Sequence, residues 1–523
     1  MPSTALHIGV DVGGTNTDAV IMRGREVLAA CKTPTTADVG SGVRAALAEV
    51  MRQAAVTPAG ISAVMIGTTH FTNAFVQGRS LAPVGVIRLA APATTSLPPF
   101  VDWPQRLQQV VEGRAAIVRG GNNYDGTEIS RIDVAEIRRV IESMQQAGIR
   151  SIAVSTVFAP VNDAQERIVR DLIEEVAPGT AVTLSSAIGR IGLLERENAT
   201  VMNASLAVMA DEVVRSFRES LHSLGLTCPF YVSQNDGTLM SPALASRFPV
   251  LTFASGPTNS IRGGGFLSGI EDGIVVDIGG TTTDVGVLVN GFPRESAVAV
   301  DVGGVRTNFR MPDVLSVGLG GGSRVRMQDG RVTIGPDSVG YRLLEEARVF
   351  GGGTLTATDI AVAAGKADIG IRSAVSDLDP TLVDGAIAVM RAMLEDAIDR
   401  MKTSAGGVPV VLVGGGSILA HRDIRGASQI IVPKNAGVAN AIGAAIAQVS
   451  GEVDQVFSYD LEGRERTLER ARAMASTRAA EAGARADTVR IVDVEELPLQ
   501  YLPGGAVRVR VKAVGELSLF AET

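Results

Sequence analysis

The sequence predicts an α/β protein with more than one domain. A chain of 523 residues is too long for a single hydrophobic core. Its 46% of hydrophobic residues indicates large buried cores, while 59 glycines with only 4% of aromatic residues indicate many tight turns. Apolar runs of strand length alternate with segments whose apolar residues recur at helical spacing, which is typical of sheets covered by helices.

One short phrase occurs twice, at residues 11–18 and at residues 277–284. The first copy reads Asp-Val-Gly-Gly-Thr-Asn-Thr-Asp and the second reads Asp-Ile-Gly-Gly-Thr-Thr-Thr-Asp. Each copy follows an apolar, β-branched run and precedes another, so each predicts two strands joined by a tight glycine turn. A single such turn is most often only a hairpin. Two near-identical copies that both begin and end on aspartate indicate a shared function.

The chemistry of the phrase favours a nucleotide phosphate held from two sides. Glycines let backbone N–H groups approach an anion closely, threonine hydroxyls add donors, and a leading carboxylate can hold hydrated Mg²⁺. The phrase is not a Walker A loop, because no Gly-Lys-Ser/Thr follows it. The candidate phosphate contacts are Gly13, Gly14, Thr15 and Asn16 in the first copy and Gly279, Gly280, Thr281 and Thr282 in the second.

The net charge and the cysteine content exclude some classes of partner and of fold stabilisation. A net charge of −8 argues against a nucleic-acid surface or an anionic membrane as partner, and favours a small molecule or another protein. The two cysteines, Cys31 and Cys228, provide no disulfide framework. The first residues do not resemble a signal peptide, and no apolar run reaches the ~20 residues that span a bilayer. We expect a soluble, cytoplasmic protein.

The first third of the chain reads as an alternating β/α region. A helix is expected at 40–55 and a buried strand at 63–66. The strand-to-helix turn that follows, 67–73, is a candidate anion or substrate cradle through Thr68 and Thr69. Further elements are expected as helices at 132–147 and 163–176 and as strands at 151–158 and 181–185.

Two glycine-rich segments stand out in the second half. The run at 318–322 permits close backbone approach through Gly320 and Gly321, although glycine runs also mark flexible loops. A short aliphatic strand at 410–413 ends in Gly414, Gly415 and Gly416, which suits the adenosine part of a nucleotide lying against bare backbone.

Other elements of the second half are expected as follows. The turns at 231–238 and 254–257 are expected to face the nucleotide. Helices are expected at 201–224 and 384–401, and a small-residue helix at 435–449 is expected to pack closely on a neighbour or to form a hinge between two lobes.

We expect three segments, of which only the last is marked by a shift in composition. Residues 1–188 would form an N-terminal lobe with the first phosphate hairpin, and residues 189–450 a second lobe with the second hairpin. From about residue 451 an Arg/Ala/Glu-rich helix (468–482) and strands at 488–494 and 507–514 predict a small β/α appendage, so that 451–523 forms the third segment.

The ordered set of motifs resembles the superfamily of actin, sugar kinases and heat-shock chaperones. Within it, the chain is similar to the hydantoinase A and 5-oxoprolinase (N-methylhydantoinase A-like) family over roughly residues 6–450. The resemblance implies a two-lobed actin-like (ribonuclease H-like) ATPase fold with the small C-terminal appendage. It rests on residues 11–18, 67–73, 192–203, 233–239, 255–265, 277–284, 318–323 and 334–340.

The resemblance also implies a mechanism. ATP would lie between the lobes with its phosphates at the two hairpins, and Asp11 and Asp277 would position Mg²⁺ through water. The phosphoryl group would pass to the carbonyl oxygen of a cyclic amide of hydantoin, 5-oxoproline or lactam type, which water then opens. A separate hydantoinase B-type subunit commonly completes the hydrolysis in this family, which implies a hetero-oligomer.

Two alternatives remain open at this level. A small-molecule kinase would need a carboxylate base for a hydroxyl acceptor, and Asp18 or Asp284 are the candidates. A nucleotide-dependent reactivating chaperone of the same superfamily would use ATP hydrolysis to move the lobes, without turning over a small substrate.

Overall fold

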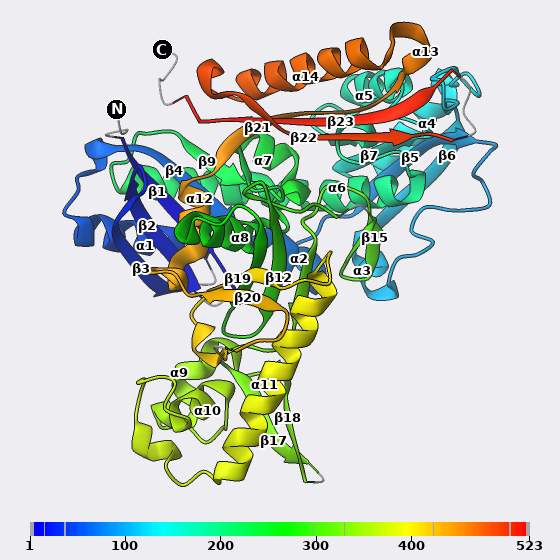
Figure 1. Cartoon of the computed structure of the whole chain (residues 1–523). Helices are drawn as coiled ribbons and strands as arrows, with labels where there is room; N and C mark the ends of the chain where they lie inside the picture. The colour runs from blue at the N-terminus through cyan, green and yellow to red at the C-terminus, as the bar shows by residue number, and fades with distance from the viewer. Residues whose placement is uncertain are drawn as a thin grey trace.

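The computed structural model describes residues 5–14, 16–35, 38–296, 298–328, 330–421, 423–500 and 504–518. Thr15, a candidate phosphate contact, lies outside these ranges. Two sheets, each containing one hairpin of the paired phrase, organise the chain (Figure 1).

The first sheet contains a five-stranded unit in the order β3-β2-β1-β4-β9. The first three strands form an antiparallel meander, whereas β4 and β9 run parallel to β1. The strands are β1 (Leu6–Val12), β2 (Asn16–Arg23), β3 (Glu26–Pro34), β4 (Ile61–Thr68) and β9 (Phe230–Ser233).

The second sheet repeats this unit. Its order is β13-β12-β11-β19-β20, again with two antiparallel pairings followed by two parallel ones, and β16 (Val314–Val317) adds to β12. The duplicated unit confirms the two-lobed actin-like α/β fold predicted from the sequence. The strands are β11 (Gly273–Ile278), β12 (Thr283–Val289), β13 (Phe292–Pro293), β19 (Val408–Val413) and β20 (Ala427–Ile431).

Two helices pack tightly against each other between these units. They are α8 (Ser255–Ser268) and α12 (Ala439–Ala445). A Cβ atom on Gly443 would overlap the carbonyl oxygen of Asn259, and one on Gly263 would overlap that of Ala439, so the two backbones touch only because both positions are glycine. The helix expected at 435–449 is shorter than predicted, because the chain becomes a strand again at Gln448.

The C-terminal segment extends the first sheet. Strand β21 (Gln448–Ser458) pairs with β10 (Thr238–Met240), and the sheet continues through β23 (Ala506–Gly515) to β22 (Arg490–Pro498). The nine-stranded sheet thus contains strands from all three segments expected at 1–188, 189–450 and 451–523. The boundaries between these segments therefore do not separate one sheet from another. These pairings are non-local, so composition alone does not reveal them.

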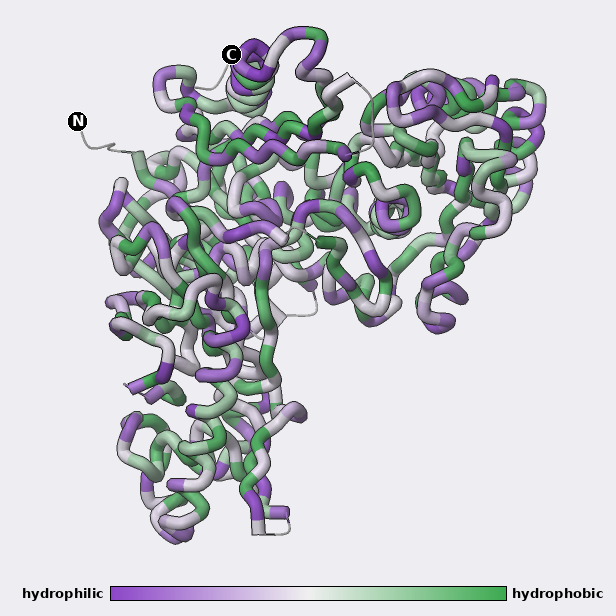
Figure 2. Tube along the Cα trace, turned by 45° about the vertical axis from the view of Figure 1, so that its right-hand side comes forward, coloured by the Kyte–Doolittle hydropathy of each residue, from purple (hydrophilic) through white to green (hydrophobic). Residues whose placement is uncertain are grey.

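Helix α14 (Arg464–Glu481) covers one face of these added strands (Figure 1). Ala471, Ala475 and Ala479 pack there against Val453 and Val511. Hydrophobic and hydrophilic residues alternate along the strands under this helix, as Figure 2 shows, so the opposite face of the sheet carries charged side chains.

A separate parallel sheet is inserted into the first half, in the order β6-β5-β7-β8, and it carries its own core between the sheet and two helices. Its strands are β5 (Val84–Ala91), β6 (Glu112–Arg119), β7 (Ser151–Thr156) and β8 (Ala181–Leu184), and its helices are α4 (Val134–Gln146) and α5 (Ala164–Val176).

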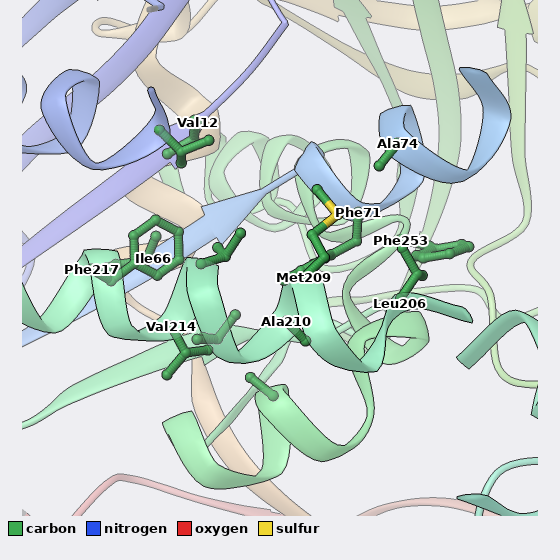
Figure 3. Packing of buried hydrophobic residues seen from close by; sticks show 14 of the residues in the cluster. Val12, Ile66, Phe71, Ala74, Leu206, Met209, Ala210, Val214, Phe217 and Phe253 are labelled. Carbon is green, nitrogen blue, oxygen red and sulfur yellow. The ribbon is translucent and has the colours of Figure 1, made fainter. Parts of the chain in front are cut away.

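The long helix α6 (Leu193–Ser223) forms much of the main core. Figure 3 shows Leu206, Met209 and Phe217 of α6 packed near Phe71 of α2 (His70–Gln77) and Ile66 of β4. A buried ion pair joins α6 to the inserted sheet, where Arg88 Nε donates to Glu197 Oε2 at 2.7 Å.

The remaining elements complete the two halves. Figure 1 shows β17, β18, α9, α10 and α11 grouped at the far end of the second half. None of the helices in the described ranges combines the length and apolarity needed to cross a bilayer. The bounds are α1 (Val39–Ala54), α3 (Gln105–Val111), α7 (Pro242–Arg247), β14 (Val300–Val302), β15 (Val305–Thr307), β17 (Ser323–Gln328), β18 (Arg331–Ser338), α9 (Leu343–Glu346), α10 (Ala357–Ala363), α11 (Pro380–Met401) and α13 (Tyr459–Glu462).

Candidate nucleotide-binding site

A cavity of about 370 Å³ is lined by residues of both five-stranded units. The two glycine hairpins, the Gly414 turn and helix α12 all contribute to its wall. A volume of this size is in the range of small-molecule sites. The candidate residues that line it are Gly13, Gly14, Asn16, Asp18, Asp277, Gly279, Gly280, Gly321, Gly414, Gly415 and Gly416.

The two hairpins have the same local geometry. In each, the first and last aspartates of the phrase are direct cross-strand neighbours, Asp11 with Asp18 and Asp277 with Asp284. Each turn is closed by one hydrogen bond of the first glycine, from Gly13 N to the Asn16 carbonyl oxygen at 3.0 Å and from Gly279 N to that of Thr282 at 2.9 Å. The repeated phrase therefore produces a repeated shape.

Asp11 and Asp18 are buried and share a hydrogen-bond donor that no sequence pattern predicts. The Asn440 side chain, from α12, donates through Nδ2 to Asp11 Oδ2 at 3.0 Å and to Asp18 Oδ2 at 2.9 Å. Lys32 of β3 donates through Nζ to Asp18 Oδ2 at 2.8 Å. Lys32 stands directly opposite Asp18 in the β2–β3 register, so hairpin register is the signal that identifies it. Asn440 has no comparable signal in the sequence.

Burial favours the neutral forms of the Asp11 and Asp277 carboxyl groups. Burial raises the pKa of Asp11 to about 6, and the charge of Asp18 adds to this rise, whereas the hydrogen bond from Asn440 opposes it. Burial also raises the pKa of Asp277, while the hydrogen bond from Ser260 and the charge of Lys32 lower it. A bound cation would reverse this effect by stabilising the charged carboxylates.

The available donor atoms suit a hydrated Mg²⁺. Asp11 Oδ1 is buried and has no hydrogen-bond partner among the described residues, and Asp277 lines the cavity. Within the described ranges, no group of three or more His, Cys, Asp and Glu side chains could hold a metal by itself. Mg²⁺ is usually held by one or two carboxylates together with water and phosphate, so two aspartates fit it.

Several candidate residues do not line this cavity. Thr68 and Thr69 support the first hairpin from behind, since Thr69 N donates to the carbonyl oxygen of Val12 at 3.2 Å. Asp284 accepts a hydrogen bond from Ser316 Oγ. The others outside the lining set are Asp11, Thr281, Thr282 and Gly320.

The glycine-rich run at 318–322 packs against the second hairpin and forms hydrogen bonds with its backbone. Gly321 N donates to the Gly279 carbonyl oxygen at 3.0 Å and Gly322 N to that of Gly280 at 2.7 Å. A Cβ atom on Gly320 would collide with the backbone of Thr281, so glycine is required for this close approach. Gly320 therefore supports the hairpin, whereas Gly321 also reaches the cavity.

The Gly414 turn lines this cavity and packs directly against the second hairpin, and its contact with adenosine stays a prediction. Gly414 has φ of +83°, and a Cβ atom there would overlap Asp277 Oδ1 and the Ile278 carbonyl oxygen. The same cavity has apolar walls that the sequence does not predict, because they come from elements distant along the chain. These walls are formed by Leu343, Phe350, Ile369 and Ile418.

The two polar turns at 231–238 and 254–257 do not face this cavity. Asn235 fixes them to each other, because its Oδ1 accepts from Ala254 N at 2.7 Å and its carbonyl oxygen accepts from Thr258 Oγ1 at 2.8 Å. Asn235 and Asp236 line a different cavity, of about 410 Å³. The expectation that these turns contact the nucleotide is therefore wrong for this cavity.

Two family models match the chain. The model described as the hydantoinase/oxoprolinase N-terminal region matches residues 7–177, and the model described as hydantoinase/oxoprolinase matches residues 196–370. The two matches include both glycine hairpins.

Three proteins illustrate which known sequences this chain is similar to. The chain is 26% identical to caprolactamase subunit alpha of Pseudomonas jessenii over 440 residues, covering 78% of this chain and 60% of that one. It is 25% identical to the acetone carboxylase beta subunit of Xanthobacter autotrophicus, covering 63% and 44%. It is 26% identical to 5-oxoprolinase of Saccharomyces cerevisiae, covering 50% and 20%. The chain thus spans 60% or less of the length of these relatives.

Two solved structures share the fold over almost the whole chain. The ATP-dependent caprolactamase of Pseudomonas jessenii superposes with a TM-score of 0.77 at 20% identity, covering 98% of this chain and 88% of that one. Nucleotide-free acetone carboxylase superposes with a TM-score of 0.67 at 18% identity, with the same coverage of both chains.

Proposed function

Because the chain belongs to the hydantoinase/oxoprolinase family, we propose that it is the ATP-using subunit of an enzyme that activates a cyclic amide for ring opening. The observation that carries the proposal is the cavity lined by two equivalent glycine hairpins, with Asp11 and Asp277 at corresponding positions. Relatives named as a caprolactamase and a 5-oxoprolinase support a lactam as the acceptor class.

The lining residues divide the cavity into two parts. Leu343, Phe350 and Ile418 offer apolar contact for a base, next to the bare backbone of the Gly414 turn. The N–H groups of the two hairpins would hold the phosphates. When bound, ATP would supply the phosphoryl group and Mg²⁺ would offset the phosphate charge.

The charged side chains have distinct roles in this proposal. Asp11 and Asp277 would hold the metal through water, and Asn440 would keep Asp11 in place through its hydrogen bond. Lys32 is the one cationic side chain among the described residues that line the cavity, and its side chain is 41% exposed. Lys32 would neutralise charge that develops on the transferred group.

Phosphorylation would solve the chemical problem that a cyclic amide poses. Amide resonance makes direct attack by water slow, whereas phosphorylation of the carbonyl oxygen activates the carbon. Water would then add to that carbon, the ring C–N bond would break as its nitrogen takes up a proton, and a second water would hydrolyse the resulting acyl phosphate to the carboxylic acid and phosphate. The protein then contributes mainly positioning and charge neutralisation. We propose that a hydantoinase B-type partner subunit completes the hydrolysis, since relatives carry subunit names such as alpha and beta.

The contacts of two aspartates argue against the kinase alternative. A kinase needs a carboxylate free to accept a proton from the acceptor hydroxyl. Asp18 already accepts hydrogen bonds from Asn440 and Lys32, and Asp284 accepts one from Ser316 outside the cavity lining. A chaperone role would need neither base, so only turnover measurements separate it from the leading proposal.

The decisive experiment measures phosphate release and ring-opened acid together. The purified chain, with and without a hydantoinase B-type protein, is incubated with Mg-ATP and with caprolactam, 5-oxoproline or hydantoin. The proposal expects one of these compounds to stimulate phosphate release in step with ring opening. Phosphate release that no cyclic amide stimulates in either condition would refute it, and a stable phosphorylated alcohol would favour the kinase.

A further inference from the structure

Helix α8 contacts the two hairpins through two consecutive residues, Asn259 and Ser260. Asn259 lies beside Asp11 of the first hairpin, and the Ser260 hydroxyl donates a hydrogen bond to Asp277 of the second. Neighbouring side chains on a helix project about 100° apart around its axis, so a helix between two units can reach both with adjacent residues. Helix α8 is therefore placed to set the positions of both aspartates.

The side-chain amide of Asn259 is buried without a hydrogen-bond partner. The residue has no exposed surface, and neither Nδ2 nor Oδ1 has a partner among the described residues. Asp11 Oδ1 also lacks one. Buried polar atoms are normally paired, because an unpaired atom retains the full cost of its removal from water. A buried amide without partners, beside a carboxylate oxygen that also has none, calls for a role in another state of the protein.

Gly67 makes room for both groups. It is the direct neighbour of Asp11 in the parallel β1–β4 register. A Cβ atom on Gly67 would lie 2.4 Å from Asn259 Nδ2 and 2.5 Å from Asp11 Oδ1, so the two atoms share the space that a side chain would fill. Burial raises the pKa of Asp11, and the nearby Asn259 amide opposes that rise. A rotation of the amide would complete a hydrogen bond to Oδ1.

The contact between α8 and α12 fixes the backbone at Asn259. Its carbonyl oxygen packs against Gly443 of α12, where no Cβ atom would fit. Helix α12 also carries Asn440, which donates to Oδ2 of Asp11. The two oxygens of Asp11 thus lie beside amides from two helices that pack directly on each other, Asn440 at Oδ2 and Asn259 at Oδ1.

We propose that Asn259 is a further positioning residue of the metal site, whose Nδ2 donates to Oδ1 of Asp11 in the metal-bound protein, as Asn440 donates to Oδ2. Together with the bond from Ser260 to Asp277, α8 then sets the spacing of the two carboxylates. The proposal rests on the function proposed above, which assigns Asp11 and Asp277 to Mg²⁺. Loss of a residue that orients a metal-binding side chain typically lowers metal affinity by about 10–100-fold.

The test measures Mg²⁺ binding by titration calorimetry of the full chain saturated with a non-hydrolysable ATP analogue. Asn259→Leu keeps the size of the side chain but has no donor, so it should weaken Mg²⁺ binding at least about tenfold. Its affinity for the analogue in EDTA should stay unchanged, because Asn259 does not line the nucleotide cavity. Its thermal midpoint without metal should not fall, because leucine replaces an amide that has no partner.

Thr258→Val is the matched control. Thr258 precedes Asn259 on α8 and is also buried, but its Oγ1 donates to the carbonyl oxygen of Asn235 at 2.8 Å, and it does not line the nucleotide cavity. Removing this hydroxyl should lower the thermal midpoint and leave Mg²⁺ binding unchanged. Asn259→Ala, a second variant without the amide, should weaken Mg²⁺ binding as Asn259→Leu does.

Asp11→Asn separates this inference from the function on which it rests. Adding Asn259→Leu to Asp11→Asn should weaken Mg²⁺ binding no further, because Asn259 acts through Asp11. Weaker binding in Asp11→Asn but full binding in both Asn259 variants would overturn the inference alone, as would an equal loss in Thr258→Val. Full binding in Asp11→Asn would overturn the metal assignment and the inference together. None of these measurements depends on which cyclic amide the enzyme accepts.

Discussion

Asn440 on helix α12 donates from Nδ2 to Oδ2 of Asp11 on strand β1, at 3.0 Å. This bond joins residues 429 positions apart and ties the helix between the two units to the first hairpin. Asn440 is thus a positioning residue for a carboxylate that we propose to hold the metal.

Replacing Asn440 by alanine should slow turnover. The substitution removes the donor shared by Asp11 and Asp18 and leaves two buried carboxylates facing each other, so we expect Mg-ATP turnover to fall by roughly 10–100-fold. Steady-state phosphate release measures the effect, with Gln53→Ala, which removes an exposed amide on α1, as control. Full activity in the Asn440 variant would show that the bond does not serve the site.

Asp11→Asn and Asp277→Asn should each reduce turnover by about 10²-fold or more, because each removes a charge that the metal needs. Titration with Mg²⁺ at saturating ATP should also show that each variant needs a higher metal concentration for half-maximal rate. Asp272→Asn, at an exposed position near the start of β11, is the matched control. Unchanged ATPase activity in both variants would remove these aspartates from the site.

Lys32→Gln should lower kcat by roughly 10²-fold with a smaller effect on stability. The Lys32 side chain is 41% exposed, and the buried Asp18 keeps its hydrogen bond from Asn440, so we expect the loss of the pair to cost about 1–2 kcal/mol. Lys32→Arg, which retains the charge, should recover part of the rate. A large loss of thermal stability with normal kcat would instead assign Lys32 a structural role.

The raised pKa of Asp11 predicts a pH dependence of stability in metal-free buffer. Its folded pKa of about 6 lies above its unfolded value near 3.9, so the folded state binds more protons between those values. Stability contributed by the protonated group is therefore present below about pH 4 and is lost as pH rises through about 6.

Asp11→Asn removes this penalty. We compare the free energy of unfolding of the variant with that of the unmodified chain. The difference should change by roughly 2–3 kcal/mol in favour of the variant as the pH rises from 4 to 7.5. Urea unfolding with EDTA at both pH values measures the gain. A difference between the two proteins that stays constant across this range would contradict the raised pKa.

Gly443→Ala should destabilise the protein. The new Cβ atom would overlap the carbonyl oxygen of Asn259 and force α8 and α12 apart, at a cost of about 1–3 kcal/mol or more. Gly406→Ala is the control, because a Cβ atom there meets nothing within 4 Å. Equal melting temperatures for the two variants would mean that the helices can separate freely.

The two hairpins, most helices and strands, and the fold class are predictable from the amino-acid sequence. The reason is that these features are local or periodic. A glycine turn between Asp11 and Asp18 closes through a bond between residues three apart, and the second copy repeats it between Gly279 and Thr282. The same locality explains why the Gly414 turn was predicted at the end of a strand.

Which side chains come into contact depends instead on how the elements pack in three dimensions. Asn440 reaches Asp11 because α12 packs on α8 and on the first sheet, and Phe350 reaches the nucleotide cavity from an element far along the chain. The C-terminal strands join the first sheet by pairings that composition does not encode, and Arg510 and Lys512 on β23 are buried in that sheet. Hydrogen bonding and charge pairing depend on distance in space, which residue spacing along the chain does not specify.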